Sequence, residues 1–234
     1  MFDNTFFSAS DFSGSVRLFP LPNLVMFPHV MQPLHIFETR YRSLMQDALR
    51  SDRLIAMATL ASGWESDYEG RPPLRSLACL GQIATYHRLH DGTYNVLLAG
   101  LHRVRIVREL APNRRFREAE VELCEDIYPN DPSAHDVQLR AMLRDEFIKI
   151  APLVREVQEQ IDQLLSGDIA LGTLTDILSY MLDISLQKKQ ALLEQLNVVR
   201  RAEMVLEHLT RAAQTYAGPL QLDMASFPPQ FSTN

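Results

Sequence analysis

Four prolines within residues 17–42 limit what the beginning of this chain can fold into. The stretch reads RLFPLPNLVMFPHVMQPLHIFETRYR, and its prolines are residues 20, 22, 28 and 33. Each proline removes a backbone hydrogen-bond donor, so any strand here must be short, bent or at a sheet edge. The apolar runs Leu18–Phe19 and Leu24–Phe27 predict two such strands. Residues 38–50 then show helical spacing. The stretch therefore predicts the start of a compact β-barrel.

The same stretch contains three recognisable sequence motifs: LFPLPN at residues 18–23, PLHIFE at 33–38 and RYR at 40–42. It resembles the start of the Lon N-terminal domain, the substrate-binding module of the ATP-dependent Lon proteases, and above all its short relatives that consist of this domain alone. The resemblance continues through DGTY at 91–94 and GLHRVRI at 100–106, and reaches about residue 210. It implies a twisted, PUA-like β-barrel and a role in recognising polypeptides.

The rest of the first half alternates apolar runs with turn residues. Gly81 suggests a bulge within a long strand, and Asp91–Gly92 has the residues of a tight hairpin turn. Gly100 is predicted to end one strand before the next begins, and residues 61–73 are predicted to be a polar loop. The strands expected after the opening stretch are Leu54–Leu60, Leu77–Leu89, Thr93–Ala99, His102–Leu110 and residues 118–123.

Helical spacing takes over after the YPNDPS linker at residues 128–133. Asp131–Pro132 favours a helix start, and Pro152 predicts a kink in the helical pattern that follows. Thr173–Asp176 resembles a capping box at the start of another helix. The expected N-caps of the last two helices are Ser185 and Asn197.

Together these patterns predict an α+β protein, a PUA-like twisted β-barrel followed by a C-terminal helical bundle. The expected parts are a flexible leader over residues 1–14, the barrel over 15–127, the bundle packed on the barrel over 128–217, and an extended or disordered tail over 218–234.

Composition and motifs argue against catalysis. None of the nine glycines is followed by lysine, so the chain lacks a phosphate-binding Gly-Lys-Ser/Thr loop. The region that carries Lon's Ser–Lys dyad is absent from a chain of 234 residues. We therefore expect no enzymatic activity and no cofactor. The seven histidines favour structural or surface roles over metal binding. Cys79 and Cys124 are each expected to be a buried free thiol. The three lysines, Lys149, Lys188 and Lys189, favour solvated positions.

The N-terminus lacks the basic region and apolar core of a signal peptide. No apolar run approaches the ~20 residues needed to span a bilayer. These features predict a cytoplasmic protein without a membrane partner.

Six residues of the opening stretch are candidates for peptide binding: Met26, Phe27, Leu34, Phe37, Arg40 and Tyr41. The apolar ones would form shallow pockets beside a proline-broken edge strand to which an extended peptide adds. The alternative is that Met26, Phe27, Leu34 and Phe37 are barrel core. Glu38 and Arg40 beside Tyr41 suit either a recognition patch or an ion-pair cluster at the helix start, and we favour the second.

RNA binding is the alternative function, because arginine pairs well with phosphate. The arginines concerned are Arg103, Arg105, Arg108, Arg114, Arg115 and Arg117. Nearby glutamates and the net charge of −6 oppose it. Arg103 and Arg105 alternate with apolar residues, as exposed positions of a strand do. These features disfavour nucleic acid as a partner. The expected partners are unfolded or extended polypeptides, with a protease or chaperone as a further possibility.

Overall fold

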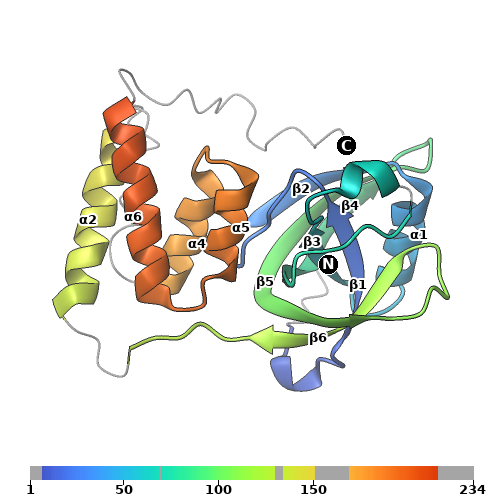
Figure 1. Cartoon of the computed structure of the whole chain (residues 1–234). Helices are drawn as coiled ribbons and strands as arrows, with labels where there is room; N and C mark the ends of the chain where they lie inside the picture. The colour runs from blue at the N-terminus through green and yellow to red at the C-terminus, as the bar shows by residue number, and fades with distance from the viewer. Residues whose placement is uncertain (1–6, 69, 130–133, 151–168, 216–234) are drawn as a thin grey trace. The chain divides into compact units, whose positions relative to one another are not determined.

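The computed structural model describes residues 7–68, 70–129, 134–150 and 169–215. The chain divides after Cys124 into two compact units, and each is described by itself. The first contains the strands and one long helix, and the second contains helices, so the fold is α+β (Figure 1).

The first unit is a closed barrel. Its elements are the strands β1 Ser15–Leu21, β2 Met31–Ile36, β3 Leu54–Thr59, β4 Leu77–Arg88, β5 Tyr94–Glu109 and β6 Arg117–Cys124, the helix α1 Thr39–Ala48, and the 3-10 turns η1 Ala9–Asp11 and η2 Trp64–Asp67. The strand order is β2-β5-β4-β3-β1-β6, and β6 also pairs with β5, which closes a ring of five strands. β2 lies outside the ring, paired with the first half of β5. The pair β1–β3 is parallel, whereas the others are antiparallel.

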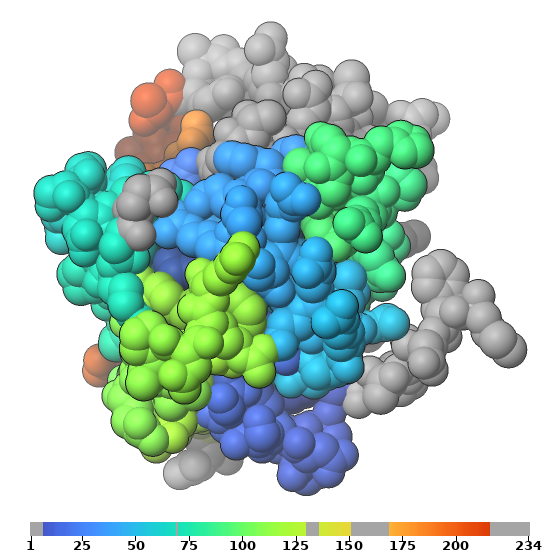
Figure 2. Space-filling view, turned by 90° about the vertical axis from the view of Figure 1, so that its right-hand side faces the viewer, coloured from blue at the N-terminus to red at the C-terminus, as the bar shows by residue number. Residues whose placement is uncertain are grey.

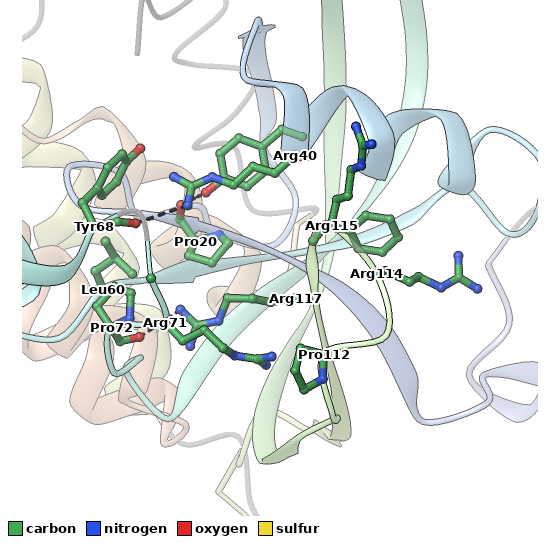
Figure 3. A pocket seen from close by; sticks show the side chains of 13 residues that line it. Pro20, Arg40, Leu60, Tyr68, Arg71, Pro72, Pro112, Arg114, Arg115 and Arg117 are labelled. Atoms are coloured by element: carbon green, nitrogen blue, oxygen red, sulfur yellow. Dashed lines mark hydrogen bonds between the residues drawn. The ribbon is translucent and has the colours of Figure 1, made fainter.

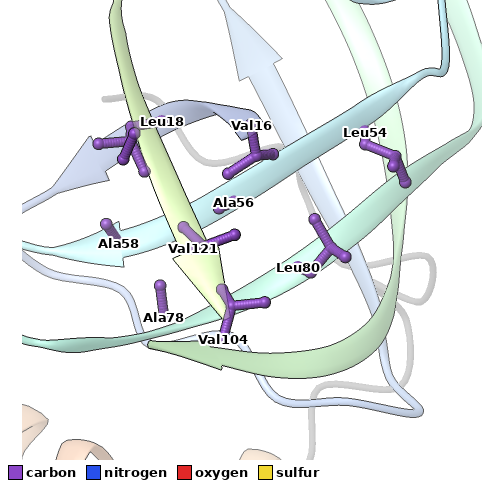
Figure 4. Close-up of a cluster of buried hydrophobic side chains, with 10 residues drawn as sticks. Val16, Leu18, Leu54, Ala56, Ala58, Ala78, Leu80, Val104 and Val121 are labelled. Atoms are coloured by element: carbon purple, nitrogen blue, oxygen red, sulfur yellow. The ribbon is translucent and has the colours of Figure 1, made fainter. Parts of the chain in front are cut away.

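Small and branched side chains fill the barrel (Figure 4). Alternate residues of each strand point inward, as a strand's period of two requires. Phe7 and Phe12 pack against this cluster, and the ring of Phe7 lies 5.3 Å from that of His102. The residues of the core cluster are Val16, Leu18, Leu54, Ala56, Ala58, Ala78, Leu80, Val104, Ala119 and Val121.

The prediction of a strand at Leu24–Phe27 is wrong. This segment is an irregular loop, although Met26 and Phe27 are buried at 1% and 0% exposure. The chain turns at Pro28 and His29, and His29 takes a left-handed backbone conformation with φ 64°. The second strand therefore begins only at Met31. The apolar composition of Leu24–Phe27 indicates that the segment is buried, but a buried segment can be a loop as well as a strand.

The prediction that Gly100 ends a strand is also wrong, because β5 runs through it from Tyr94 to Glu109. Gly100 is required for a different reason. A Cβ atom there would lie 2.1 Å from the carbonyl oxygen of Phe27. The loop is held against the strand by backbone bonds from His29 N–H to the Gly100 carbonyl and from Gly100 N–H to the Val30 carbonyl, at 3.0 and 2.8 Å.

Other local predictions are confirmed. The β4–β5 register shifts between Leu80 and Gly81, where the bulge was expected. Gly92 has φ 82°, as its hairpin turn requires. Asn197 caps the last helix, since its Oδ1 accepts from the Arg200 backbone N–H at 3.0 Å. Neither cysteine forms a disulfide, and Cys79 is buried as expected, but the predicted burial of Cys124 is wrong because its side chain is partly exposed.

The second unit consists, in its described part, of α2 Ala134–Ile150, α4 Leu171–Met181, α5 Leu186–Glu194 and α6 Val198–Thr215. α6 packs against α2 and α4. Leu143, Leu178 and Leu209 have no exposed surface. The segment 125–128 joins this unit through a bridge between Ile127 and Asn197.

The capping box predicted at Thr173–Asp176 is wrong, because α4 already begins at Leu171. Thr175 and Asp176 serve a buried guanidinium instead. Arg201 of α6 has 0% exposure and bonds through Nε to Thr175 Oγ1 at 2.9 Å. The same guanidinium pairs with Asp126 at 2.5 Å and lies 3.5 Å from Asp176. We call Arg201, Asp126, Thr175 and Asp176 the Arg201 network.

Several predictions fall outside the described residues: the helix start at Asp131–Pro132, the kink at Pro152, the first part of the leader, and the tail. Among the described helices, none is long and apolar enough to cross a membrane.

Candidate functional site

The structure separates the six candidate peptide-binding residues into two groups. Met26, Phe27 and Leu34 are buried at 2% exposure or less, and they contribute to the interior of the first unit. Phe37, directly after β2, is 42% exposed, so the barrel-core alternative is wrong for this residue. Arg40 and Tyr41 lie in the first turn of α1, where Tyr41 is buried and Arg40 is half-buried. The surface around the start of α1 therefore contains the accessible candidates.

Arg40 occupies a built position between two aromatic rings. Its guanidinium carbon lies 4.8 Å from the ring centres of both Tyr41 and Tyr68, a distance at which a cation is attracted to a ring face. Arg40 Nε donates to Glu38 Oε2 at 2.8 Å, and Nη1 donates to the Tyr68 carbonyl at 3.2 Å. The Tyr68 hydroxyl donates to Glu38 Oε1 at 3.0 Å. These contacts attach the 61–73 loop to the start of α1, so the ion-pair interpretation of Glu38 and Arg40 describes their contacts.

Tyr41 is a structural residue. Its ring stacks on Phe19 with centroids 4.0 Å apart, and its hydroxyl donates to the Pro20 carbonyl at 2.8 Å. Burial raises the pKa of Tyr41 well above its usual value. Burial, followed by the charge of Glu38, raises the pKa of Tyr68 as well. Both phenols therefore stay neutral donors at physiological pH.

β2 forms an open edge in the sense that no described strand pairs with its outer side, although four of its six residues are buried. It pairs with β5 from Met31–Ala99 to Ile36–Tyr94, and no other described strand pairs with it. Met31 is 44% exposed, and Phe37 follows the other end. Pro33 within the strand has no N–H to offer, which is one way in which proteins protect an edge from indiscriminate pairing. A shallow dent of about 10 Å³ between β2 and α1 is lined by Leu34, Phe37 and Tyr41, among others.

A larger cavity of about 160 Å³ opens on the other side of Tyr41, and we call it the arginine pocket. It lies between the end of the 61–73 loop, the start of α1 and the turn before β6, where the space-filling view shows a hollow (Figure 2). Its lining residues are Pro20, Arg40, Tyr41, Leu60, Tyr68, Gly70, Arg71, Pro72, Pro112, Arg114, Arg115, Phe116 and Arg117 (Figure 3). No residue of the 61–73 loop was predicted from the sequence to belong to a binding site. The aromatic residues Trp64 and Tyr68 in that polar loop were the available signal.

Ion pairs surround the arginine pocket. Glu109 accepts from Arg117 Nε and from Arg71 Nη2, each at 2.8 Å. Arg114 pairs with Asp47, which also accepts from Arg17 Nε at 2.6 Å. Burial opposes ionisation of Glu109, but the bonds from Arg117 and Arg71 outweigh it and hold the pKa of Glu109 below its usual value. The pKa of Asp47 is lowered in the same way by Arg17 and Arg114, against the effect of burial.

This arrangement predicts acid sensitivity of the first unit. A carboxyl group with a lowered folded-state pKa stabilises the fold above its unfolded pKa, and that stability is lost as the pH falls through the folded value. For Glu109 the loss should begin near pH 4.5 and grow below it. The urea midpoint of Trp64 fluorescence, measured from neutral pH downward, should therefore fall in acid. Because Trp64 is the single tryptophan, it reports on the first unit alone.

Glu109→Gln is the matched control for this prediction. It should lower the urea midpoint at neutral pH and reduce the further decrease of that midpoint in acid. The decrease that remains would come from Asp47. A variant whose midpoint declines as steeply as that of the wild type would show that Glu109 does not carry the acid sensitivity.

The arginines proposed for RNA binding do not form one exposed face. Arg103 is only 3% exposed, so its predicted exposure is wrong. Arg108 pairs with Glu120 across β5 and β6, and Arg117 and Arg114 are paired as described above. Arg115 is exposed and makes no ion pair with any residue that the structure describes.

Other potentially reactive groups lie apart from this surface. Lys189 was expected to be solvated, but it is half-buried and donates to the Tyr180 carbonyl at 2.9 Å. Burial lowers the pKa of Lys189. Within the described ranges, no group of three His, Cys, Asp or Glu side chains is placed to hold a metal ion.

Comparison with known sequences gives one family. A family model described as the ATP-dependent protease La (LON) substrate-binding domain matches residues 15–211. Lon protease 2 of Myxococcus xanthus is 28% identical over 222 residues, which are 92% of this chain and 26% of that protein. Lon protease 2 of Desulfotalea psychrophila is 29% identical over 198 residues, 84% of this chain and 25% of that protein. The chain thus spans about a quarter of the length of these relatives.

Two solved structures share the fold. The N-terminal domain of a Lon protease from the Mycobacterium avium complex superimposes with a TM-score of 0.66 at 18% identity, covering 84% of this chain and 98% of that one. A Lon N-terminal domain protein from Xanthomonas campestris gives 0.60 at 22% identity, covering 82% and 97%.

Proposed function

This chain belongs to the family of ATP-dependent protease La (LON) substrate-binding domains, and from this premise we propose that it binds extended polypeptides without acting on them chemically. The family match covers the substrate-binding part alone. The described residues also lack a metal-holding group, and the sequence has no Gly-Lys-Ser/Thr loop. A protease or a chaperone is the class of partner that such a module would serve.

The observation that carries this proposal is the open edge of β2. Backbone groups on such an edge can pair with an extended segment, which then becomes an additional strand. Met31 and Phe37, both more than 40% exposed, stand at the two ends of β2. They would contact alternate apolar side chains of the added segment.

The affinity should be modest. Ordering an unfolded segment costs conformational entropy, which offsets much of what its contacts contribute. We expect micromolar binding, about −8 kcal/mol.

The test is the binding of a fluorescent unfolded polypeptide, followed by anisotropy. Met31→Ala/Phe37→Ala should weaken binding about tenfold, because it removes the two exposed apolar contacts beside the edge. Val107→Ala is the matched control, since Val107 is 53% exposed in the half of β5 that pairs with β6. It should leave binding unchanged.

A second arm tests the backbone pairing itself. The same polypeptide with N-methyl groups at alternate positions keeps its side chains but loses donors, so its binding should be lost. If the N-methylated polypeptide binds as tightly as its parent, the edge of β2 is not the recognition element.

A further inference from the structure

The arginine pocket is positively charged, and backbone pairing at the edge of β2 would not require this charge. Among the residues that the structure describes, thirteen line the pocket; five of these are arginine and none is acidic. The carboxylates that pair with these arginines, Glu38, Asp47, Glu109 and Glu118, are not among the described lining residues. The pocket therefore presents a cationic wall to whatever enters it.

The ion pairs neutralise only part of the positive charge of these arginines. Arg71 and Arg117 share the single carboxylate of Glu109. Arg115 is exposed, and within the described part of the chain no carboxylate lies within ion-pair distance of it. An incoming anion would thus meet charge that is not yet neutralised.

Several of the guanidinium groups are already fixed in place. Arg117 is held by Glu109 and by the Pro72 carbonyl, to which Nη1 donates at 2.9 Å. Arg40 is held between Tyr41 and Tyr68. Its Nη2 lies 2.8 Å from Glu38 Oε2, but at an angle that makes no hydrogen bond, and this buried atom has no other partner among the described residues. Donors that are ordered before binding cost little entropy when a ligand arrives.

The apolar lining residues of the arginine pocket and its volume further limit the kind of ligand that it can bind. Pro20, Leu60, Pro72, Pro112 and Phe116 give the cavity an apolar lining between the arginines, which strengthens charge interactions by reducing the effective dielectric constant. A volume of about 160 Å³ is small beside the ~300–1,000 Å³ of pockets that hold drug-sized ligands. It suits one side-chain head group rather than a nucleotide.

We propose that the arginine pocket binds an oxyanion, the carboxylate or phosphate of one acidic residue carried by the bound polypeptide. This inference rests on the proposed function and specifies its substrate class. Tyr41 lines both the pocket and the dent beside β2, so a segment along β2 has the pocket at its side. The protein then selects segments in which an anionic residue lies near apolar ones.

The test uses three unfolded peptides that differ at one position, which carries serine, aspartate or phosphoserine. Both anionic peptides should bind about tenfold more tightly than the serine peptide, because each gains charge-assisted hydrogen bonds. The ratio between aspartate and phosphoserine distinguishes the two sources of the oxyanion. Arg71→Gln/Arg115→Gln should reduce the preference to less than about twofold while leaving affinity for the serine peptide unchanged.

Arg105→Gln/Arg200→Gln is the matched control. Both residues are exposed and do not line the pocket. The control has the same net charge as the pocket variant, so a general electrostatic effect would appear in both. It should retain the full preference.

Further outcomes separate the pocket from the proposed function. Equal binding of all three peptides to the wild type would overturn the inference and leave polypeptide binding intact. Quenching of Trp64 by inorganic phosphate, lost in the pocket variant but without binding of any peptide, would overturn both and leave a small-anion site. Tighter binding of single-stranded oligouridylate than of the phosphoserine peptide would replace the polypeptide with RNA.

Discussion

Replacing Arg201 with methionine is expected to lower the free energy of unfolding of the helical unit by about 3–5 kcal/mol. The side chain has no exposed surface, and neither has Asp176. Methionine fills similar space but removes the guanidinium that lies 3.5 Å from the buried Asp176 carboxylate. Removal of one member of a buried ion pair is costly for this reason, even where replacement of both members is tolerated.

Urea unfolding followed by far-ultraviolet circular dichroism measures this effect, since most of the helix lies in the second unit. Arg211→Met is the control, because Arg211 forms an exposed pair with Glu207, with side-chain exposures of 62% and 56%. Such a pair contributes about 0.5 kcal/mol or less.

Addition of Asp176→Asn to Arg201→Met should recover part of the loss by removing the buried negative charge that faced the guanidinium. An Arg201→Met protein within about 1 kcal/mol of the wild type would show that the Arg201 network does not hold the bundle together.

Replacing Gly100 with alanine should destabilise the barrel by about 3 kcal/mol, near the upper end of the usual range for overpacking. The new Cβ would lie 2.1 Å from the Phe27 carbonyl oxygen and 3.1 Å from Pro28 Cα, all backbone atoms. Backbone cannot rotate away as a side chain can. The 24–30 loop must therefore leave β5, with loss of the bonds between Gly100 and both His29 and Val30.

Gly81→Ala is the matched control in the adjacent strand. Its Cβ would meet mainly the side chain of Leu98, at 2.8 Å, which can shift. We expect a loss of about 1 kcal/mol there. Urea unfolding followed by Trp64 fluorescence compares the two. Equal losses would mean that the close approach of the loop to Gly100 contributes nothing particular.

The sequence predicts elements with strong periodicity well. The long strand β4, the hairpin at Gly92, α1 and β6 follow from local residue order. It fails where an apolar run is buried without being a strand, as at Leu24–Phe27, and where a glycine serves a distant loop, as at Gly100. In both positions the deciding contact is with a residue far along the chain.

In the candidate site, too, residues close together in the sequence could be predicted, whereas contacts between distant segments could not. Phe37 and Arg40 could be selected from sequence because they stand in the opening stretch. The arginine pocket could not, since Arg40, Arg71 and Arg117 come from three separate elements. The Arg201 network was also missed, because Asp126 lies 75 residues before its partner. Spacing within a helix carries no information about such a pair.

The pairing of β1 with β6 sets the order in which the barrel can form. Ser15 lies opposite Glu120, so closure joins positions roughly a hundred residues apart along the chain and pays the corresponding loop-closure entropy. During synthesis β3 reaches β1 early, but β6, the second neighbour of β1, becomes available only when nearly the whole first unit has left the ribosome. Such non-local topology makes folding slow. The docking of β6 is then the step that completes the barrel.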